Sequence, residues 1–151
     1  MTRELIAYGL ETTYARAIRC VEDLSEDDAR QRPSGLTPVI WQLGHLVVSD
    51  SGYLSRAGGS TEIPEGYGPL FKTGTGSAAD YPTLAEVRRH FETIQRGLLD
   101  AASSTDLSKP VEGRSYRTAG EVLTFTAYHR GYHVGKMTTI RALLGKPRLF
   151  G

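Results

Sequence analysis

The sequence predicts an all-α protein, a four-helix bundle with a long crossover loop between the second and third helices. Four segments carry apolar residues at steps of three and four, the spacing that puts side chains on one face of a helix. No alternation of apolar and polar residues is long enough to predict a sheet. The stretch 58–81 is rich in Gly, Pro, Ser and Thr, which indicates a loop. Four amphipathic helices of this length are typical of a bundle.

The first helix is predicted over 1–24. Apolar or small side chains recur there every three or four residues: Ile6, Leu10, Thr13, Ala17, Cys20 and Leu24. Because Cys20 lies in this row, packing is the favoured interpretation, ahead of a reactive thiol. The letters SEDD at 25–28 have the form of a capping box, and Pro33 and Gly35 then break the chain.

The second helix is predicted within 36–59. Thr37 is its expected N-cap, Pro38 its first helical residue, and Gly58 with Gly59 its stop. In the loop 58–81 that follows, we expect Leu70 and Phe71 to be pinned against the body of the protein. Loops of this length are often lids or interaction segments.

The third and fourth helices each begin at a predicted capping box. Thr83 and Glu86 form the first box, and Thr118 and Glu121 form the second. Gly145 and Pro147 are the expected end of the last helix. His90 falls off the apolar row of the third helix, so it is interpreted as a surface residue.

Composition limits the function classes. A length of 151 residues predicts a single domain over 1–151. The net charge of +1, from 18 basic and 17 acidic residues, argues against nucleic acid and against a polybasic membrane patch. One cysteine excludes an internal disulfide and a thiolate zinc cluster. Without a signal-like N-terminus or an apolar run approaching ~20 residues, we expect a cytoplasmic protein with no membrane partner.

Two of the four histidines, His129 and His133, lie four residues apart in the last helix. That spacing puts both on one face, where they could share an ion. Both fall on or beside the apolar row, and a buried imidazole needs partners for its nitrogens, which a metal supplies. The zincin helix has a similar pair, but Arg130 stands where zincins carry the general base, so a metalloprotease is excluded.

A third candidate ligand is His45, in the middle of the second helix. Gly44 precedes it, and Gly131 and Gly135 lie around His133. Each glycine costs a helix about 1 kcal/mol relative to alanine. One reason to accept that cost is a close approach of helices, so we expect the second and last helices to meet near the histidines.

Three motifs of this sequence resemble the DinB superfamily. They are W-x-x-x-H-L in the second helix, S-E-D and R-P around 25–33, and H-x-x-Y-H-x-G-K-M-x-x-I-R-x-L-L-G-K-P at the end. The resemblance covers nearly the whole chain and implies a four-helix bundle with a long crossover. It maps the family's metal-binding histidines onto His45, His129 and His133. The residue after the first of the paired histidines is often acidic in the family, and Arg130 departs from that.

Three imidazoles would leave positions open on a divalent transition metal, as in catalytic sites. Zinc or nickel is the expected ion, with iron or copper as alternatives. The resemblance implies a metal-dependent enzyme, a thiol-dependent S-transferase or a hydrolase, acting on a small-molecule substrate with a low-molecular-weight thiol as a possible partner. The alternative is a non-enzymatic, stress-associated bundle with a structural or vestigial metal site. No side chain is singled out as catalytic.

Three further expectations concern the surface, the aromatic residues and the pH dependence. A homodimer is expected, partly from the resemblance and partly because Tyr67, Leu70 and Phe71 look exposed enough to cover a partner. The aromatic residues Trp41, Phe125, Tyr128 and Tyr132 could line an apolar pocket, but aromatics at helical spacing are more often ordinary core, so core is the favoured interpretation and none is expected to be catalytic. Metal stabilisation should fade from neutrality to about pH 5 as imidazole protonates, and metal-free protein should fall less because its histidines face a hydrated cavity.

Overall fold

The structure is a computed structural model that describes residues 2–78, 80–113 and 115–150. Within these ranges every named element is a helix, and the one bridge outside them pairs Pro110 with Thr118. The expected all-α class is confirmed. None of the described helices has the length and apolar character to cross a membrane. The elements are α1 (Arg3–Arg19), α2 (Glu26–Arg30), a 3-10 turn (Pro33–Gly35), α3 (Val39–Arg56), α4 (Tyr67–Phe71), α5 (Leu84–Ser104) and α6 (Ala119–Leu143).

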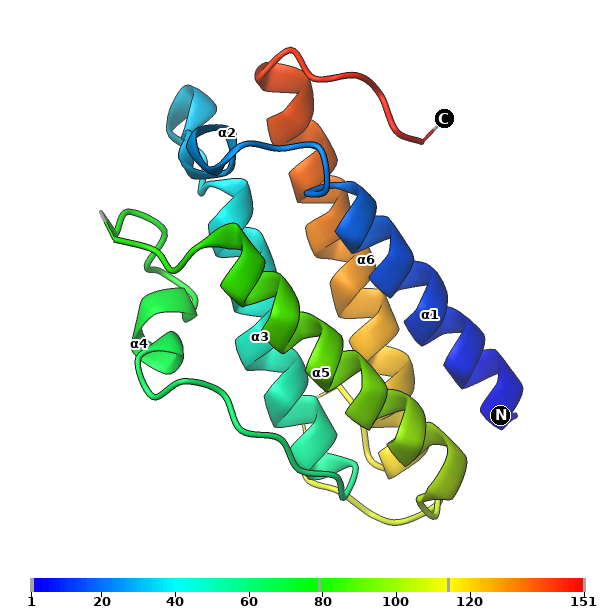
Figure 1. The fold of residues 1–151 in the computed structure, drawn as a ribbon. Coiled ribbons are helices and arrows are strands. Elements are labelled where there is room, and N and C mark those ends of the chain that lie inside the picture. The colour runs from blue at the N-terminus through cyan, green and yellow to red at the C-terminus, as the bar shows by residue number, and fades with distance from the viewer. Residues whose placement is uncertain (1, 79, 114, 151) are drawn as a thin grey trace.

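Four long helices, α1, α3, α5 and α6, lie side by side (Figure 1). The helix α6 packs against α1 and α3, and α5 packs against the same two helices from the other side. Figure 1 also shows that α3 and α5 run in the same direction. The chain between them therefore returns along the length of α3, and it carries the short helix α4 against α3 on the way.

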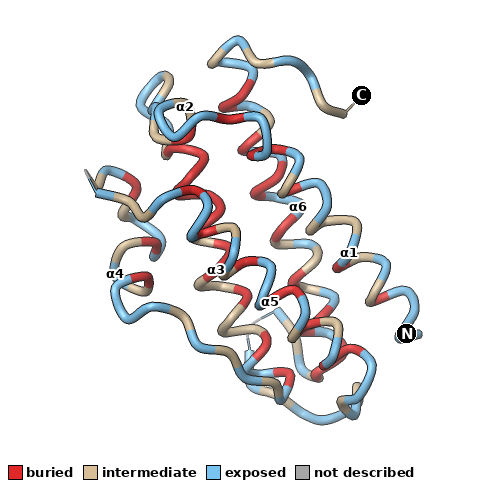
Figure 2. Tube along the Cα trace, in the orientation of Figure 1, coloured by how far each residue is buried: buried red, intermediate tan, exposed pale blue. Residues whose placement is uncertain are grey.

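The core lies between the long helices, where the buried positions face inward (Figure 2). Each helix contributes fully buried apolar side chains, among them Leu10, Leu43, Phe91 and Leu123. Cys20 is also fully buried, and burial raises the pKa of its thiol to about 11. Because the thiolate is the reactive form, this cysteine has a packing role, as its place in the apolar row predicts.

The helix starts follow the sequence signals with two exceptions. Thr83 forms its capping box with Glu86, and Thr118 accepts from the Glu121 N–H at 3.3 Å. The Glu121 carboxylate, however, accepts from the Arg117 N–H at 2.6 Å rather than closing a box on Thr118. At α3 the predicted cap is wrong: Pro38 is the N-cap, and the Thr37 hydroxyl accepts instead from the side-chain amide of Gln42.

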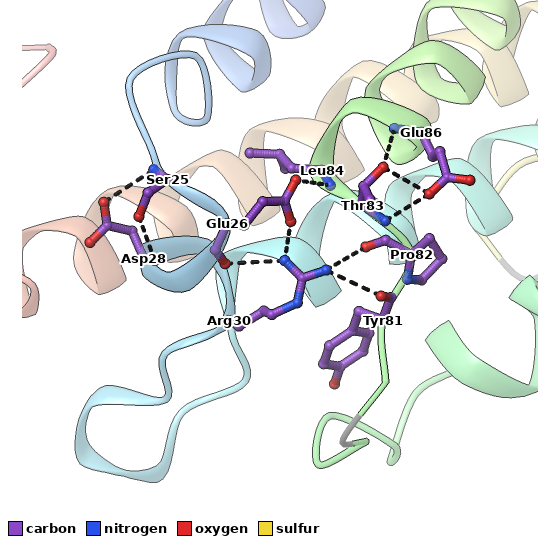
Figure 3. A network of polar contacts seen from close by, with 9 residues as sticks. All are labelled: Ser25, Glu26, Asp28, Arg30, Tyr81, Pro82, Thr83, Leu84 and Glu86. Carbon is purple, nitrogen blue, oxygen red and sulfur yellow. Dashed lines mark hydrogen bonds and ion pairs between the residues drawn. The ribbon is translucent and has the colours of Figure 1, made fainter.

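The end of the crossover is fastened to α2 (Figure 3). Arg30 donates from Nη2 to the carbonyl oxygens of Tyr81 and Pro82, at 3.2 and 2.9 Å. The Glu26 carboxylate accepts from the Leu84 N–H at 2.7 Å, at the start of α5. Glu26 and Arg30 also bond to each other, so one turn of helix holds both the incoming loop and the first turn of α5.

The crossover is more ordered than a plain loop over 58–81. It contains α4, and both Tyr67 and Phe71 are buried against their own chain, while Leu70 is partly buried. The expectation that Leu70 and Phe71 are pinned is thus confirmed, but Tyr67 and Phe71 provide no exposed apolar surface. The homodimer therefore stays a prediction, without this surface to support it.

Candidate metal centre

The three predicted histidines come together between α3 and α6. His45 lies in the middle of α3, and His129 and His133 lie one turn apart in α6. One ring nitrogen from each can be chosen so that all three lie within 4.8 Å of one another. The Nε2 atoms of His129 and His133 are 3.2 Å apart. His90 is elsewhere, on α5, with its ring against Tyr67.

Two of the imidazoles are oriented through Nδ1. His133 donates from Nδ1 to the side-chain carbonyl oxygen of Gln42 at 2.6 Å. His45 donates from Nδ1 to the backbone carbonyl of Phe71 at 2.8 Å. Because a carbonyl oxygen only accepts, each Nδ1 carries the proton and each Nε2 keeps a lone pair. Outer hydrogen bonds of this kind orient histidine ligands in metal sites.

The site is dry enough to keep its histidines neutral. The pKa of His133 is lowered to about 3, chiefly by burial and then by His129 and His45. The pKa of His129 is lowered to about 4, chiefly by burial and then by His45 and Arg130. The pKa of His45 is also lowered, chiefly by burial. His133 is only 3% exposed, whereas His45 and His129 are partly exposed, so the expectation of a hydrated cavity fails for His133. Neutral imidazole is the form that binds metal.

No carboxylate joins the three histidines in the part of the chain that the structure describes. Asp50 is completely buried, but its Oδ2 pairs with Nε of Arg130 at 2.7 Å. Asp50 therefore points away from the face of His45. Arg130, the residue that departs from the family pattern, is likewise buried and points away from the site to make this pair.

Aromatic rings surround the histidines. Trp41 stacks on His45 with ring centroids 4.9 Å apart. Tyr53 and Phe125 contact the ring of His129, with centroids at 5.6 and 6.3 Å. The interpretation as core holds for Trp41 but is wrong for two residues on α6: Tyr128 is 72% exposed and Tyr132 is 55% exposed.

The glycines have different surroundings from those expected. A Cβ at Gly44 would overlap the ring of Phe71. The glycine therefore leaves room for Phe71 of the segment between α3 and α5, and not for a close approach of α6. Gly131 and Gly135 are exposed and have open space where a Cβ would lie. The helices α3 and α6 do meet at the histidines, but the glycines are not the reason.

A cavity of about 380 Å³ adjoins the site through Gln42, on the side of His133 away from Nε2. Its size is in the range of small-molecule sites. Lys136, with its ammonium 4.7 Å from the centre of the Tyr132 ring, is the charged residue in its lining. The remaining lining residues are Leu36, Thr37, Gly135, Thr139 and Ile140.

Sequence reasoning missed the two groups that orient the histidines. Gln42 carried a usable signal, because it is a polar residue in the apolar run VIWQLGHL, three residues before His45. The carbonyl of Phe71 carried none, because every residue has one.

Comparison with known proteins supports the same family. A search of curated proteins finds no match to this chain. The family model described as the DinB superfamily matches residues 9–137, a span that contains all three histidines and most of the four long helices. The chain belongs to the DinB superfamily.

Proposed function

We propose that this protein is a metal-dependent enzyme that binds a divalent transition metal through His45, His129 and His133. The reaction would be a thiol-dependent S-transfer or a hydrolysis on a small molecule. The observation that supports it most is the convergence of three neutral imidazoles, two of them with Nδ1 already bonded to a carbonyl oxygen.

The donor set fits such an ion. Imidazole suits zinc, nickel, copper and iron, and we propose zinc or nickel first. Two nitrogens each ~2.0–2.1 Å from one tetrahedral ion are about 3.4 Å apart, close to the 3.2 Å between Nε2 of His129 and Nε2 of His133. A bound ion would supply Lewis acidity that lowers the pKa of a thiol or a water at its open positions.

The chain's own residues would bind and orient the substrate. The rings of Trp41, Tyr53 and Phe125 pack against His45 and His129 and would limit the access of water to them. The cavity beside Gln42 lies on the far side of His133 from Nε2, so it would hold a part of the substrate remote from the ion, and Lys136 would favour an anionic group there. We assign no side chain the role of general acid, base or nucleophile.

A second candidate is a non-enzymatic bundle whose metal site is structural or vestigial. It is favoured because no carboxylate or thiol joins the histidines in the described ranges. The Ser49 hydroxyl lies 3.2 Å from Nε2 of His45, but it also donates to the His45 carbonyl at 2.8 Å. Asp50 is committed to Arg130, and the Cys20 thiol is buried with a raised pKa.

Cobalt separates the two candidates. Cobalt(II)-loaded protein is titrated with N-acetylcysteine while the absorption spectrum is recorded. An enzyme that presents open positions to thiols should show a saturable change in the cobalt spectrum, and His133→Ala should show neither bound cobalt nor the change. The non-enzymatic bundle would be favoured by two results together: the protein binds one cobalt ion whose spectrum does not change when thiol is added, and it does not hydrolyse test esters.

The finer description of the fold and assembly is also proposed. The parallel course of α3 and α5, with the chain returning between them, supports a four-helix bundle with a long crossover. A homodimer is supported only by the family, and light scattering at micromolar concentration tests it.

A further inference from the structure

We propose that the crossover segment 67–76 is a clamp that positions His45, so that docking of this segment and binding of metal favour each other. The segment comprises α4 and the turn that follows it. The inference rests on the proposed metal site, and it adds a part of the chain outside the long helices to that site.

The first observation is the source of the hydrogen bond to His45. His133 is oriented by Gln42, a side chain of α3. His45 is oriented by the carbonyl of Phe71, which comes from the crossover, 26 positions along the chain. When that carbonyl moves away, Nδ1 loses its acceptor and the ring can take the other tautomer, which removes the Nε2 lone pair.

The second observation is how the carbonyl is held. The Phe71 side chain is fully buried and lies over the backbone of α3 in the space left by Gly44. Tyr67 and Tyr81 pack against the same ring, with centroids at 5.2 and 5.7 Å. Since interiors are close-packed, a methyl group at position 44 must displace the Phe71 ring and its carbonyl with it.

The third observation is a second attachment on the other side of His45. Trp41, which stacks on the His45 ring, donates from Nε1 to the hydroxyl of Thr75 at 3.0 Å. That hydroxyl lies 2.8 Å from the carbonyl oxygen of Leu70 and 2.7 Å from that of Lys72. One short segment thus fixes His45 directly through Phe71 and indirectly through the indole stacked on it.

These contacts make metal binding and docking reciprocal. If docking raises metal affinity by some factor, metal must favour the docked segment by the same factor. Loss of an outer hydrogen bond to a metal ligand typically costs about 10–100-fold in affinity. We therefore expect Gly44→Ala to weaken zinc binding about tenfold or more, and Thr75→Val to weaken it less.

The test compares zinc affinity, measured by chelator competition, in four variants. Gly44→Ala and Thr75→Val disturb the clamp. Gly135→Ala is the matched glycine control, because a methyl group there meets open space. Leu98→Ala is the stability control, because Leu98 is buried in α5 but lies far from His45. The adjacent Gly97 contacts Leu54, which is nine residues along α3 from His45. Circular dichroism confirms that each metal-free variant folds.

Two further readouts report on the segment itself. Trp41 is the single tryptophan, so its fluorescence should change when zinc binds, and the change should shrink in Thr75→Val. Amide hydrogen exchange over 67–76 should slow in wild type on adding zinc and should slow less in Gly44→Ala.

The outcomes separate the clamp from the metal site. The clamp is supported if Gly44→Ala and Thr75→Val bind zinc more weakly while Gly135→Ala and Leu98→Ala keep wild-type affinity. It is overturned if Gly44→Ala binds like wild type, if Leu98→Ala loses as much affinity, or if zinc leaves exchange over 67–76 unchanged. In those cases loss of zinc in His133→Ala would still uphold the metal site. Wild type that binds no zinc would overturn both.

Discussion

Two polar clusters lie at the interface of α3 and α6, and they offset the cost of burying polar groups in different ways. In one, Asp50 and Arg130 are both completely buried and pair at 2.7 Å. In the other, three histidines converge and no acid balances them within the described ranges. His129 and Arg130 are adjacent in the chain, so neighbouring residues of α6 point to different clusters.

The ion pair is tied into the whole protein. Arg130 of α6 bonds to Asp50 of α3, to the carbonyl of Leu10 in α1 at 3.1 Å and to Gln95 of α5 at 2.6 Å. Its guanidinium also lies 4.8 Å from the centre of the Phe91 ring. Residues from all four long helices therefore meet at one charge.

The difference shows which cluster is available to a ligand. The two charges of the ion pair compensate each other, so the pair is structural, although Oδ1 of Asp50 and Nη2 of Arg130 are buried without a hydrogen-bond partner. The histidines have no counter-charge and instead stay neutral, with the pKa of two of them lowered to about 4 and about 3. Neutral ring nitrogens that lie within 4.8 Å of one another are what a cation would stabilise.

The largest expected effect comes from breaking the ion pair. Arg130→Met leaves the Asp50 carboxylate buried without a partner, and we expect a loss of about 3–5 kcal/mol in the free energy of unfolding. Urea denaturation of metal-free protein measures it. The double variant Asp50→Asn, Arg130→Met should recover much of the loss. A single variant as stable as wild type would show that the pair is not structural.

The next effect comes from removing a histidine. His133→Ala should lower zinc affinity by more than ~100-fold, the upper range for losing only an outer partner. Without metal, the same variant should lose less stability than Arg130→Met, because no charge is left unpaired. Elemental analysis and urea denaturation of the two variants test the contrast, which disappears if His133→Ala keeps its zinc.

A smaller effect concerns pH in metal-free protein. The ordinary histidine pKa is 6.5, and folding lowers it to about 4 for His129 and about 3 for His133. The unfolded chain therefore binds more protons below pH 6.5, so the stabilisation present above that pH is lost as the pH falls toward 4. Each histidine contributes at most ~1.4 kcal/mol per pH unit.

Denaturation of chelated protein between pH 7 and pH 5 checks this expectation, and the range avoids the titration of ordinary carboxylates. The expectation of a weaker fall without metal than with it stays a prediction, although His133 is buried rather than hydrated. The double variant His129→Ala, His133→Ala should have a flatter profile. Equal slopes in wild type and double variant would contradict the lowered pKa values.

The smallest effect should come from Gly135→Ala. The position is helical and exposed, with open space for a methyl group. Alanine should stabilise the protein by about 0.5–1 kcal/mol through helix propensity alone, with zinc affinity unchanged. A thermal melt and a zinc titration suffice. Destabilisation would mean that a contact outside the described chain, such as a second copy, covers this glycine.

Much of the fold could be predicted because its signals are local. The caps at Thr83 and Thr118 and the apolar rows depend on neighbours along one helix. The end of α1 could not be predicted, since no Gly or Pro marks it. The helix ends at Arg19. Just beyond it, Arg141 of α6 donates to the Cys20 carbonyl and pairs with the Asp23 carboxylate. That contact spans 121 positions along the chain.

The site divides in the same way. His129 and His133 follow from helical spacing, and His45 from its place in an apolar run. The short helix α4 was missed because five residues cannot form a stable helix alone, and it depends on packing against α3. With α4 unforeseen, the carbonyl that orients His45 was unforeseen too.

The order of the elements along the chain has a consequence for biosynthesis. Both polar clusters need α6, which follows α3 by more than sixty residues. A nascent chain that has emerged only through α5 has Asp50 without its guanidinium and one imidazole of three. Such a chain lacks two of the three metal ligands and the cation that pairs with Asp50. Both clusters are therefore completed late, when α6 packs against α1 and α3.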